Sequence, residues 1–154
     1  MPVEDADTVG LAPSQLVELP GRGTTLVRQL EGPHPSAPTV VLLHGLGVDA
    51  DLNWFASYPA LARRYNVVAL DHRGHGRGVR TRRFRLADCA DDVAALCEVL
   101  GIERITPVGY SMGGPVAQLL WHRHRDLVQG MVLCATAARF GRAAGRQLAS
   151  WVIP

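Results

Sequence analysis

The sequence predicts an α/β fold: a mainly parallel, open sheet of about six strands flanked by helices. Two observations predict this class. Continuous runs of β-branched and aliphatic residues at 39–43, 67–70 and 105–108 are typical of parallel strands that are buried on both faces. These runs alternate with segments whose apolar residues recur every three or four positions, as in amphipathic helices. At 154 residues, the chain is long enough for one globular domain with its own core.

A hairpin is expected to open the sheet. Residues 15–19 and 24–30 have strand character, and they flank Pro20-Gly21-Arg22-Gly23, a strong turn signal. The pattern indicates an antiparallel pair at one edge. Residues 1–14 precede it, and we expect them to form a flexible leader.

The middle of the chain reads as strand, helix, strand, helix. The strand at 39–43 is followed by a helix expected over 53–65, and then by the strand at 67–70. From Leu86 to Leu100, apolar residues recur at helical spacing with acidic residues between them, and Cys89 and Cys97 fall on the apolar face. We therefore expect these two cysteines to be core thiols.

The third strand leads into Gly109-Tyr110-Ser111-Met112-Gly113, and a helix is expected over 114–124. A strand, a sharp turn and a helix around G-x-S-x-G form a nucleophile elbow, in which the central serine occupies a strained backbone conformation. Small residues on either side let the strand and helix approach each other closely. Ser111 is therefore the candidate nucleophile.

Composition excludes several function classes. The 16 basic residues, all arginine, and 14 acidic residues give a net charge of +2, which argues against nucleic-acid or membrane-surface partners. The acidic start lacks the pattern of a signal peptide, and no apolar run reaches membrane-spanning length, so we expect a cytoplasmic protein. The three cysteines show neither zinc nor disulfide spacing. We expect no metal and no cofactor.

Three motifs in order resemble those of the α/β-hydrolase fold family. They are His44-Gly45-Leu46-Gly47, Asp71-His72-Arg73-Gly74-His75-Gly76 and Gly109-Tyr110-Ser111-Met112-Gly113-Gly114. The resemblance implies that Ser111 attacks the substrate and that the backbone N–H groups of Leu46 and Met112 form the oxyanion hole. It also implies structural roles in the loops for His44, Gly45, Asp71, Gly109 and Gly113. Asp71 as an acid and His72 or His75 as bases are rejected, and His44 as a base is a weak alternative.

The resemblance covers only the N-terminal part of the family. A serine nucleophile needs a histidine base held by a carboxylate, and this fold supplies them after the serine. Downstream of Ser111 the only acid is Asp126, and the only histidines are His122 and His124, some 15 Å or more down the predicted helix. The sequence thus resembles a hydrolase without its last two strands, with 15–137 as core and 138–154 as the start of a lid.

The leading prediction is a serine hydrolase acting on an ester, lactone or related small-molecule acyl substrate, with the catalytic acid and base absent from this chain. Serine at the elbow argues against dehalogenases and epoxide hydrolases of the family, and leaves esterase, lactonase, C–C hydrolase, acyltransferase and perhydrolase open. The rivals are a truncated, non-catalytic chain or interaction module, and a site completed by a second chain. A strand expected at 128–135 would form an open apolar edge, which favours self-association. The arginines at 77–85 are expected to lie on a solvated loop.

Overall fold

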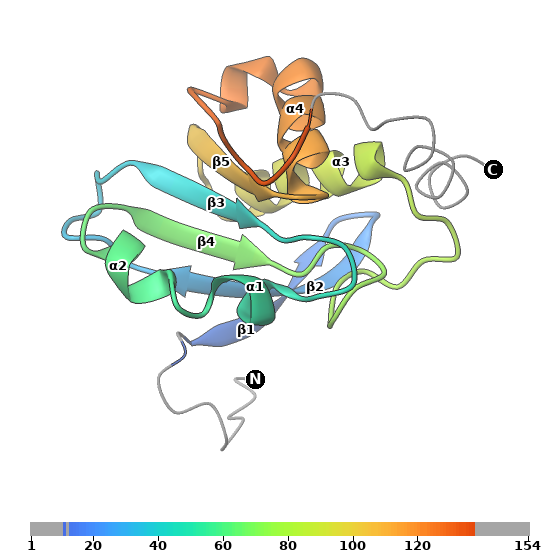
Figure 1. The fold of residues 1–154 in the computed structure, drawn as a ribbon, viewed down its shortest axis with the longest axis horizontal. Helices are drawn as coiled ribbons and strands as arrows, with labels where there is room; N and C mark the ends of the chain where they lie inside the picture. The colour runs from blue at the N-terminus through green and yellow to red at the C-terminus, as the bar shows by residue number, and fades with distance from the viewer. Residues whose placement is uncertain (1–10, 12, 138–154) are drawn as a thin grey trace.

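The computed structural model describes Leu11 and residues 13–137, and these form a six-stranded sheet with helices on both faces (Figure 1). Its strand order is β1-β2-β4-β3-β5-β6. The strands are β1 (Ser14–Leu19), β2 (Gly23–Leu30), β3 (Thr39–Leu43), β4 (Asn66–Leu70), β5 (Ile105–Tyr110) and β6 (Val132–Cys134). The helical segments are α1 (Ala50–Trp54), α2 (Tyr58–Ala62), α3 (Leu86–Val99), α4 (Gly113–Arg123) and the 3₁₀ helix η1 (Arg125–Leu127). The predicted fold class is confirmed.

The sheet is parallel except for the N-terminal hairpin. β3 lies at the centre and pairs in parallel with β4 and β5, and β6 continues the parallel pairing beyond β5. β1 and β2 form the expected antiparallel hairpin, and β2 pairs antiparallel with β4. The hairpin turn uses Gly21 and Gly23 at φ angles of 70° and 121°, which favour glycine. The carboxyl ends of the four parallel strands therefore meet at one end of the sheet.

Alternate residues of the central strands enter two cores on opposite faces. Val41 and Leu43 pack with α3 and α4, whereas Val40 and Leu42 pack with α1 and α2. Each run is therefore buried on both faces, as its unbroken apolar sequence predicts. Cys89 and Cys97 lie in the α3 core as predicted, and burial raises the pKa of both thiols to about 12.

The helix expected over 53–65 is wrong in its extent. The segment forms two short helices, α1 and α2, because Pro59 has no N–H and its ring would clash inside a continuous helix. The first helix also begins three residues earlier than expected. The Asp49 carboxylate caps it by accepting the Leu52 N–H at 2.8 Å.

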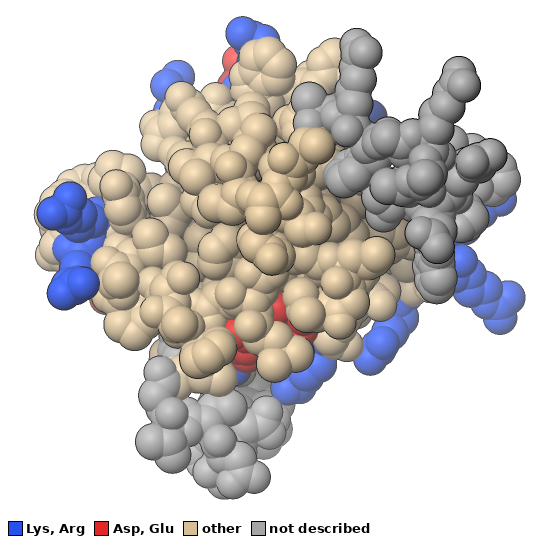
Figure 2. All heavy atoms as spheres, in the orientation of Figure 1, with Lys and Arg blue, Asp and Glu red and all other residues tan. Residues whose placement is uncertain are grey.

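The strand expected at 128–135 is also shorter in the structure. Val128 makes an isolated bridge to Ile105, and regular pairing resumes only over the three residues of β6. Val132 and Leu133 are 46% and 44% exposed, and in the described part of the chain β6 pairs only with β5. Figure 2 shows the molecule in the orientation of Figure 1. The centre of the face in view is almost free of charged side chains apart from a small acidic area, while arginines stand out at its margins.

Other expectations concern residues at the two ends. β1 begins at Ser14, so the expected leader lies outside the described residues except for Leu11 and 13–14, and the expected lid at 138–154 lies outside them entirely. Within the described chain, no helix combines the length and apolarity needed to cross a membrane. The five arginines at 77, 80, 82, 83 and 85 are all exposed, as expected for a solvated loop.

Candidate active site

Ser111 occupies the turn between β5 and α4 with a φ of 49°. This left-handed conformation is strained for a residue with a Cβ, and the surrounding contacts hold it in place. The Ser111 N–H donates to the Cys134 carbonyl at 3.0 Å, while its own carbonyl accepts from the Gly114 N–H and the Thr136 hydroxyl, at 3.0 and 2.8 Å. The side chain is half-buried at the carboxyl end of β5.

The glycines of the elbow are required by close approaches of the backbone. A Cβ at Gly109 would lie 2.3 Å from the Gly113 carbonyl oxygen, and one at Gly113 would lie 2.1 Å from the Leu43 carbonyl oxygen. A Cβ at Gly114 would lie 2.3 Å from the Thr136 hydroxyl oxygen. The strand, the helix and the neighbouring β3 can meet this closely only without side chains.

The loop after β3 lies against the elbow. A Cβ built on Gly45 would be 3.5 Å from the Ser111 Cβ and 3.2 Å from the Tyr110 ring, so the first and third motifs are in contact. The backbone N–H groups of Leu46 and Met112 have no hydrogen-bond acceptor among the described residues. Two backbone donors therefore remain available in the loops that meet at Ser111.

His44 is fully buried and both of its ring nitrogens are engaged. Its Nε2 accepts the His72 backbone N–H at 2.8 Å, so in the neutral ring the proton is on Nδ1, which donates to the Gly45 carbonyl at 2.7 Å. Burial lowers the pKa of His44 to about 4. These contacts leave no nitrogen free to take a proton from Ser111, and they hold the loop instead.

Asp71 also serves backbone groups. Its Oδ1 accepts the Ala50 N–H at 2.9 Å and its Oδ2 accepts the Arg77 N–H at 2.8 Å. A Cβ at Gly76 would lie 2.4 Å from Oδ2, so the turn wraps closely around the carboxylate. Burial raises the pKa of Asp71. Both of its carboxylate oxygens accept backbone N–H groups, and among the described residues Asp71 makes no hydrogen bond to the Ser111 hydroxyl.

A buried ion pair, which the sequence did not reveal, holds the same turn. The Arg73 guanidinium donates to both oxygens of the Asp92 carboxylate at 2.6 and 2.7 Å, and Arg22 of the hairpin donates to the same group at 2.6 Å. The hydrogen bonds to Asp92 raise the pKa of Arg73. The pair joins the turn after β4 to α3 and to the β1–β2 hairpin.

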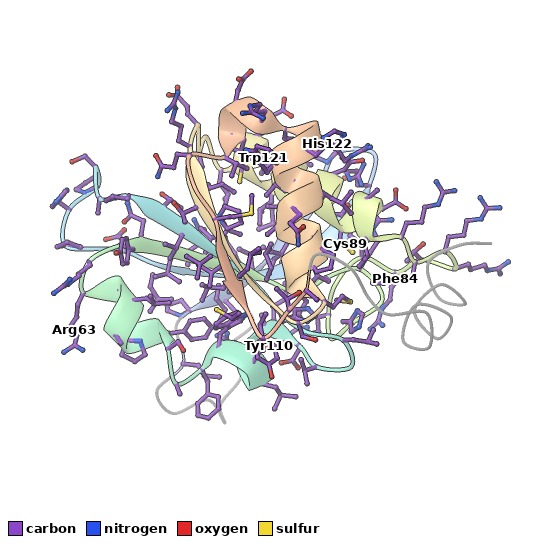
Figure 3. All side chains as sticks on the ribbon, turned by 45° about the horizontal axis from the view of Figure 1, so that its top comes forward. Arg63, Phe84, Cys89, Tyr110, Trp121 and His122 are labelled. Atoms are coloured by element: carbon purple, nitrogen blue, oxygen red, sulfur yellow. The ribbon has the colours of Figure 1, made fainter. Side chains whose placement is uncertain are left out.

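The residues after Ser111 do not complete a triad in the described part of the chain. His122 is exposed near the end of α4 that lies away from Tyr110 (Figure 3). The His124 Nε2 lies 2.8 Å from the Asp91 carboxylate, and Asp126 is exposed on η1. Neither histidine contacts the Ser111 hydroxyl.

Two further histidine rings, those of His72 and His75, lie next to the His44 ring. His72 is fully buried, its ring lies 4.5 Å from that of His44, and its two ring nitrogens have no partner among the described residues. His75 lies 5.3 Å from His44. The described residues contain no group of three or more His, Cys, Asp or Glu side chains that could hold a metal ion.

Comparison with known proteins assigns the family. A family model described as alpha/beta hydrolase fold matches residues 38–152. The chain belongs to the α/β-hydrolase family. The matched region contains all three motifs.

Several relatives of this α/β-hydrolase chain are named hydrolases. A hydrolase from Pseudomonas aeruginosa PA01 has a TM-score of 0.76 and 29% identity over 89% of this chain and 52% of that one. The enol-lactonase from Burkholderia xenovorans LB400 has a TM-score of 0.73 and 32% identity over 82% and 48%. Epoxide hydrolase B from Mycobacterium tuberculosis is 35% identical over 72% of this chain and 32% of the relative. The chain spans about half the length of these relatives or less.

Proposed function

We propose that this α/β-hydrolase chain supplies the nucleophile and the oxyanion hole of a serine hydrolase for an ester, lactone or related acyl substrate. The observation that carries the proposal is the placement of Ser111. Its half-buried side chain stands on a strained turn, with Gly45 packed beside it. The N–H groups of Leu46 and Met112 have no acceptor among the described residues, so they are free to donate to a substrate oxygen.

The chemistry follows from these groups. The Ser111 Oγ attacks the substrate carbonyl carbon, its proton passes to a general base, and the carbonyl electron pair moves onto the oxygen. The Leu46 and Met112 N–H groups donate to this oxyanion, and one such donor typically lowers the barrier by about 3–4 kcal/mol. Collapse of the intermediate expels the protonated leaving group, and water then hydrolyses the acyl-enzyme.

We infer that the described residues do not supply the catalytic acid and base, and residues 138–154 contain no Asp, Glu or His. His44 is engaged through both nitrogens, and His124 is bound to Asp91. A serine hydroxyl is a poor nucleophile without such a base. We propose a substrate class and not a single substrate, because the named relatives include a lactonase and an epoxide hydrolase.

Among the described residues no histidine is placed to act as a base for Ser111, and this favours a second candidate function, a hydrolase-like chain without catalysis that acts through its surface. In that case the elbow and the loop after β3 would keep their structural contacts, and Ser111 would have no enhanced reactivity. The two candidates differ in one measurable property, the reactivity of the Ser111 hydroxyl.

Covalent labelling tests the choice. The purified chain is treated with a fluorophosphonate probe, and the modified residue is located by mass spectrometry. We expect a slow adduct on Ser111, because an oxyanion hole retains part of the rate enhancement when the base is missing. The adduct should be lost in Ser111→Ala and retained in Ser36→Ala. Ser36 is the matched control because its exposed hydroxyl lies 2.9 Å from His34 Nδ1. A folded chain that is unlabelled at Ser111 would contradict the proposal and favour the non-catalytic candidate.

A further inference from the structure

We propose that Asn53 is a positioning residue that sets the direction of the Leu46 N–H in the oxyanion hole. Its side chain reaches from α1 to the loop after β3, where Oδ1 accepts the Gly45 N–H at 3.0 Å. Asn53 acts through the backbone and has no direct role in the chemistry. The inference rests on the proposed function, in which the Leu46 N–H is one of the two donors.

Gly45 needs such a restraint because glycine has wide backbone freedom. The peptide before it is held by Asn53 through the Gly45 N–H, and the peptide after it is held by His44 through the Gly45 carbonyl at 2.7 Å. With both flanking peptide planes fixed, the φ and ψ angles of Gly45 are fixed as well. The described chain has no cis peptide, so the Leu46 N–H points away from the His44 ring.

We call the two hydrogen bonds to Gly45, from His44 and to Asn53, the clamp on Gly45. Its His44 contact depends on which ring nitrogen of His44 carries the proton. The His72 backbone N–H donates to His44 Nε2 at 2.8 Å, which requires the neutral tautomer with its proton on Nδ1. That proton is the one donated to the Gly45 carbonyl. The backbone of one motif thereby orients the loop of another.

The other side of the clamp is anchored through α1. The Asp71 carboxylate accepts the Ala50 N–H at 2.9 Å at the start of this helix, and Asp49 accepts the Leu52 N–H at 2.8 Å. The neighbouring Trp54 side chain is buried in the core on the same face of the sheet. The backbone that carries Asn53 is thus fixed to the end of β4, and Asp71 contributes to the oxyanion loop through the helix.

The test compares Asn53→Leu, which removes the acceptor at similar size, with Asn53→Asp, which keeps an oxygen there. Leu52→Ala is the matched control on the same helix, since the Leu52 side chain is 68% exposed. The primary readout is the residual dipolar coupling of the Leu46 N–H bond, which reports its direction. We expect the Leu46 coupling to change in Asn53→Leu and to stay at the wild-type value in Asn53→Asp and Leu52→Ala. In all three variants the couplings of Val41 and Leu42 should be unaltered.

The second readout is the rate of phosphonylation of Ser111. Removing an oxyanion donor typically costs about 10²–10³ in rate, so a misdirected Leu46 N–H should slow Asn53→Leu about tenfold or more. If wild-type Ser111 is unreactive, the proposed function fails, while the dipolar coupling still tests the role of Asn53. An unchanged Leu46 coupling in folded Asn53→Leu would overturn the inference. If that variant does not fold, Asn53→Ala is measured in its place with the same two expectations.

Discussion

Gly113 is the position where the elbow tolerates a side chain least. A Cβ there would lie 2.1 Å from the Leu43 carbonyl oxygen, which is backbone of the central strand and cannot move aside alone. We expect Gly113→Ala to lower the free energy of unfolding by about 3 kcal/mol, because α4 and β3 must separate. Urea unfolding followed by circular dichroism measures the change.

Gly130 provides the matched control for this substitution. A Cβ at Gly130 would meet no heavy atom within 4 Å, so Gly130→Ala should change the free energy of unfolding by less than about 0.5 kcal/mol. Equal effects at the two positions would show that the approach of β3 to α4 is not what excludes a side chain from the elbow.

The neutral, buried His44 predicts a loss of stability in mild acid. Its pKa is lowered to about 4 by burial, against about 6.5 in the unfolded chain, so below pH 6.5 the unfolded state binds the proton that the folded state refuses. Stability conferred by the neutral ring is complete above pH 6.5 and falls as the pH drops toward 4. Between pH 7 and pH 5 this residue should remove about 2 kcal/mol from the free energy of unfolding.

Urea unfolding at pH 7, 6 and 5 measures this slope. His72 adds to it in the same direction, since burial lowers its pKa well below the ordinary value. The variant Leu52→Ala, which shortens an exposed, non-titrating side chain, should keep the wild-type slope. A stability that is constant from pH 7 to pH 5 would contradict the buried, neutral state of these rings.

At the residue scale, the sequence predicted the turn that carries Ser111. Ser111 and its flanking glycines form a local pattern, and that pattern reflects a single turn. Asn53 and Thr136 were missed, because each contributes one hydrogen bond to a backbone group that is distant in sequence. No periodicity or spacing marks such a contact before the fold brings the two segments together.

At the scale of elements, the existence of strands and helices was predictable and their extent was not. The apolar runs of β3 and β4 specify strands that are buried on both faces, and this required no knowledge of their neighbours. The segment at 53–65 was misjudged because Pro59, in the first turn of α2, cannot lie inside a continuous helix. β6 is short because the chain leaves the sheet between Val128 and Val132, a detour that depends on packing and not on local propensity.

We propose that copies of the chain associate through the exposed edge at β6. Its outer side is unpaired within the described residues, and Val132 and Leu133 are exposed there. A charged side chain on an edge strand opposes such pairing. Leu133→Lys should therefore lower the average mass of the chain measured by analytical ultracentrifugation at high concentration.

Leu52→Lys is the matched control for association, because Leu52 is 68% exposed on α1. It should leave the association constant unchanged. An equal effect of both lysine variants would show that added charge, and not the edge of β6, governs association.

At the scale of the whole molecule, the parallel sheet is what assembles the candidate site. The loops after β3 and β5 follow strands that pair in register from Thr39 with Ile105 to Leu43 with Gly109, so both loops emerge at the same end. The three motifs could therefore be placed together from the predicted topology alone. The clamp on Gly45 could not, because it depends on the tautomer of His44 and on the position of α1.

The most direct test of Ser111 as a nucleophile facing two backbone donors is the amide NMR spectrum of the fluorophosphonate-treated chain. Phosphonylation places an oxygen where the oxyanion would form. We predict a single adduct on Ser111, with the amide protons of Leu46 and Met112 shifted downfield as they donate to that oxygen. An adduct on Ser111 that leaves both amide signals unmoved, or a folded chain with no adduct there, would contradict the site described above.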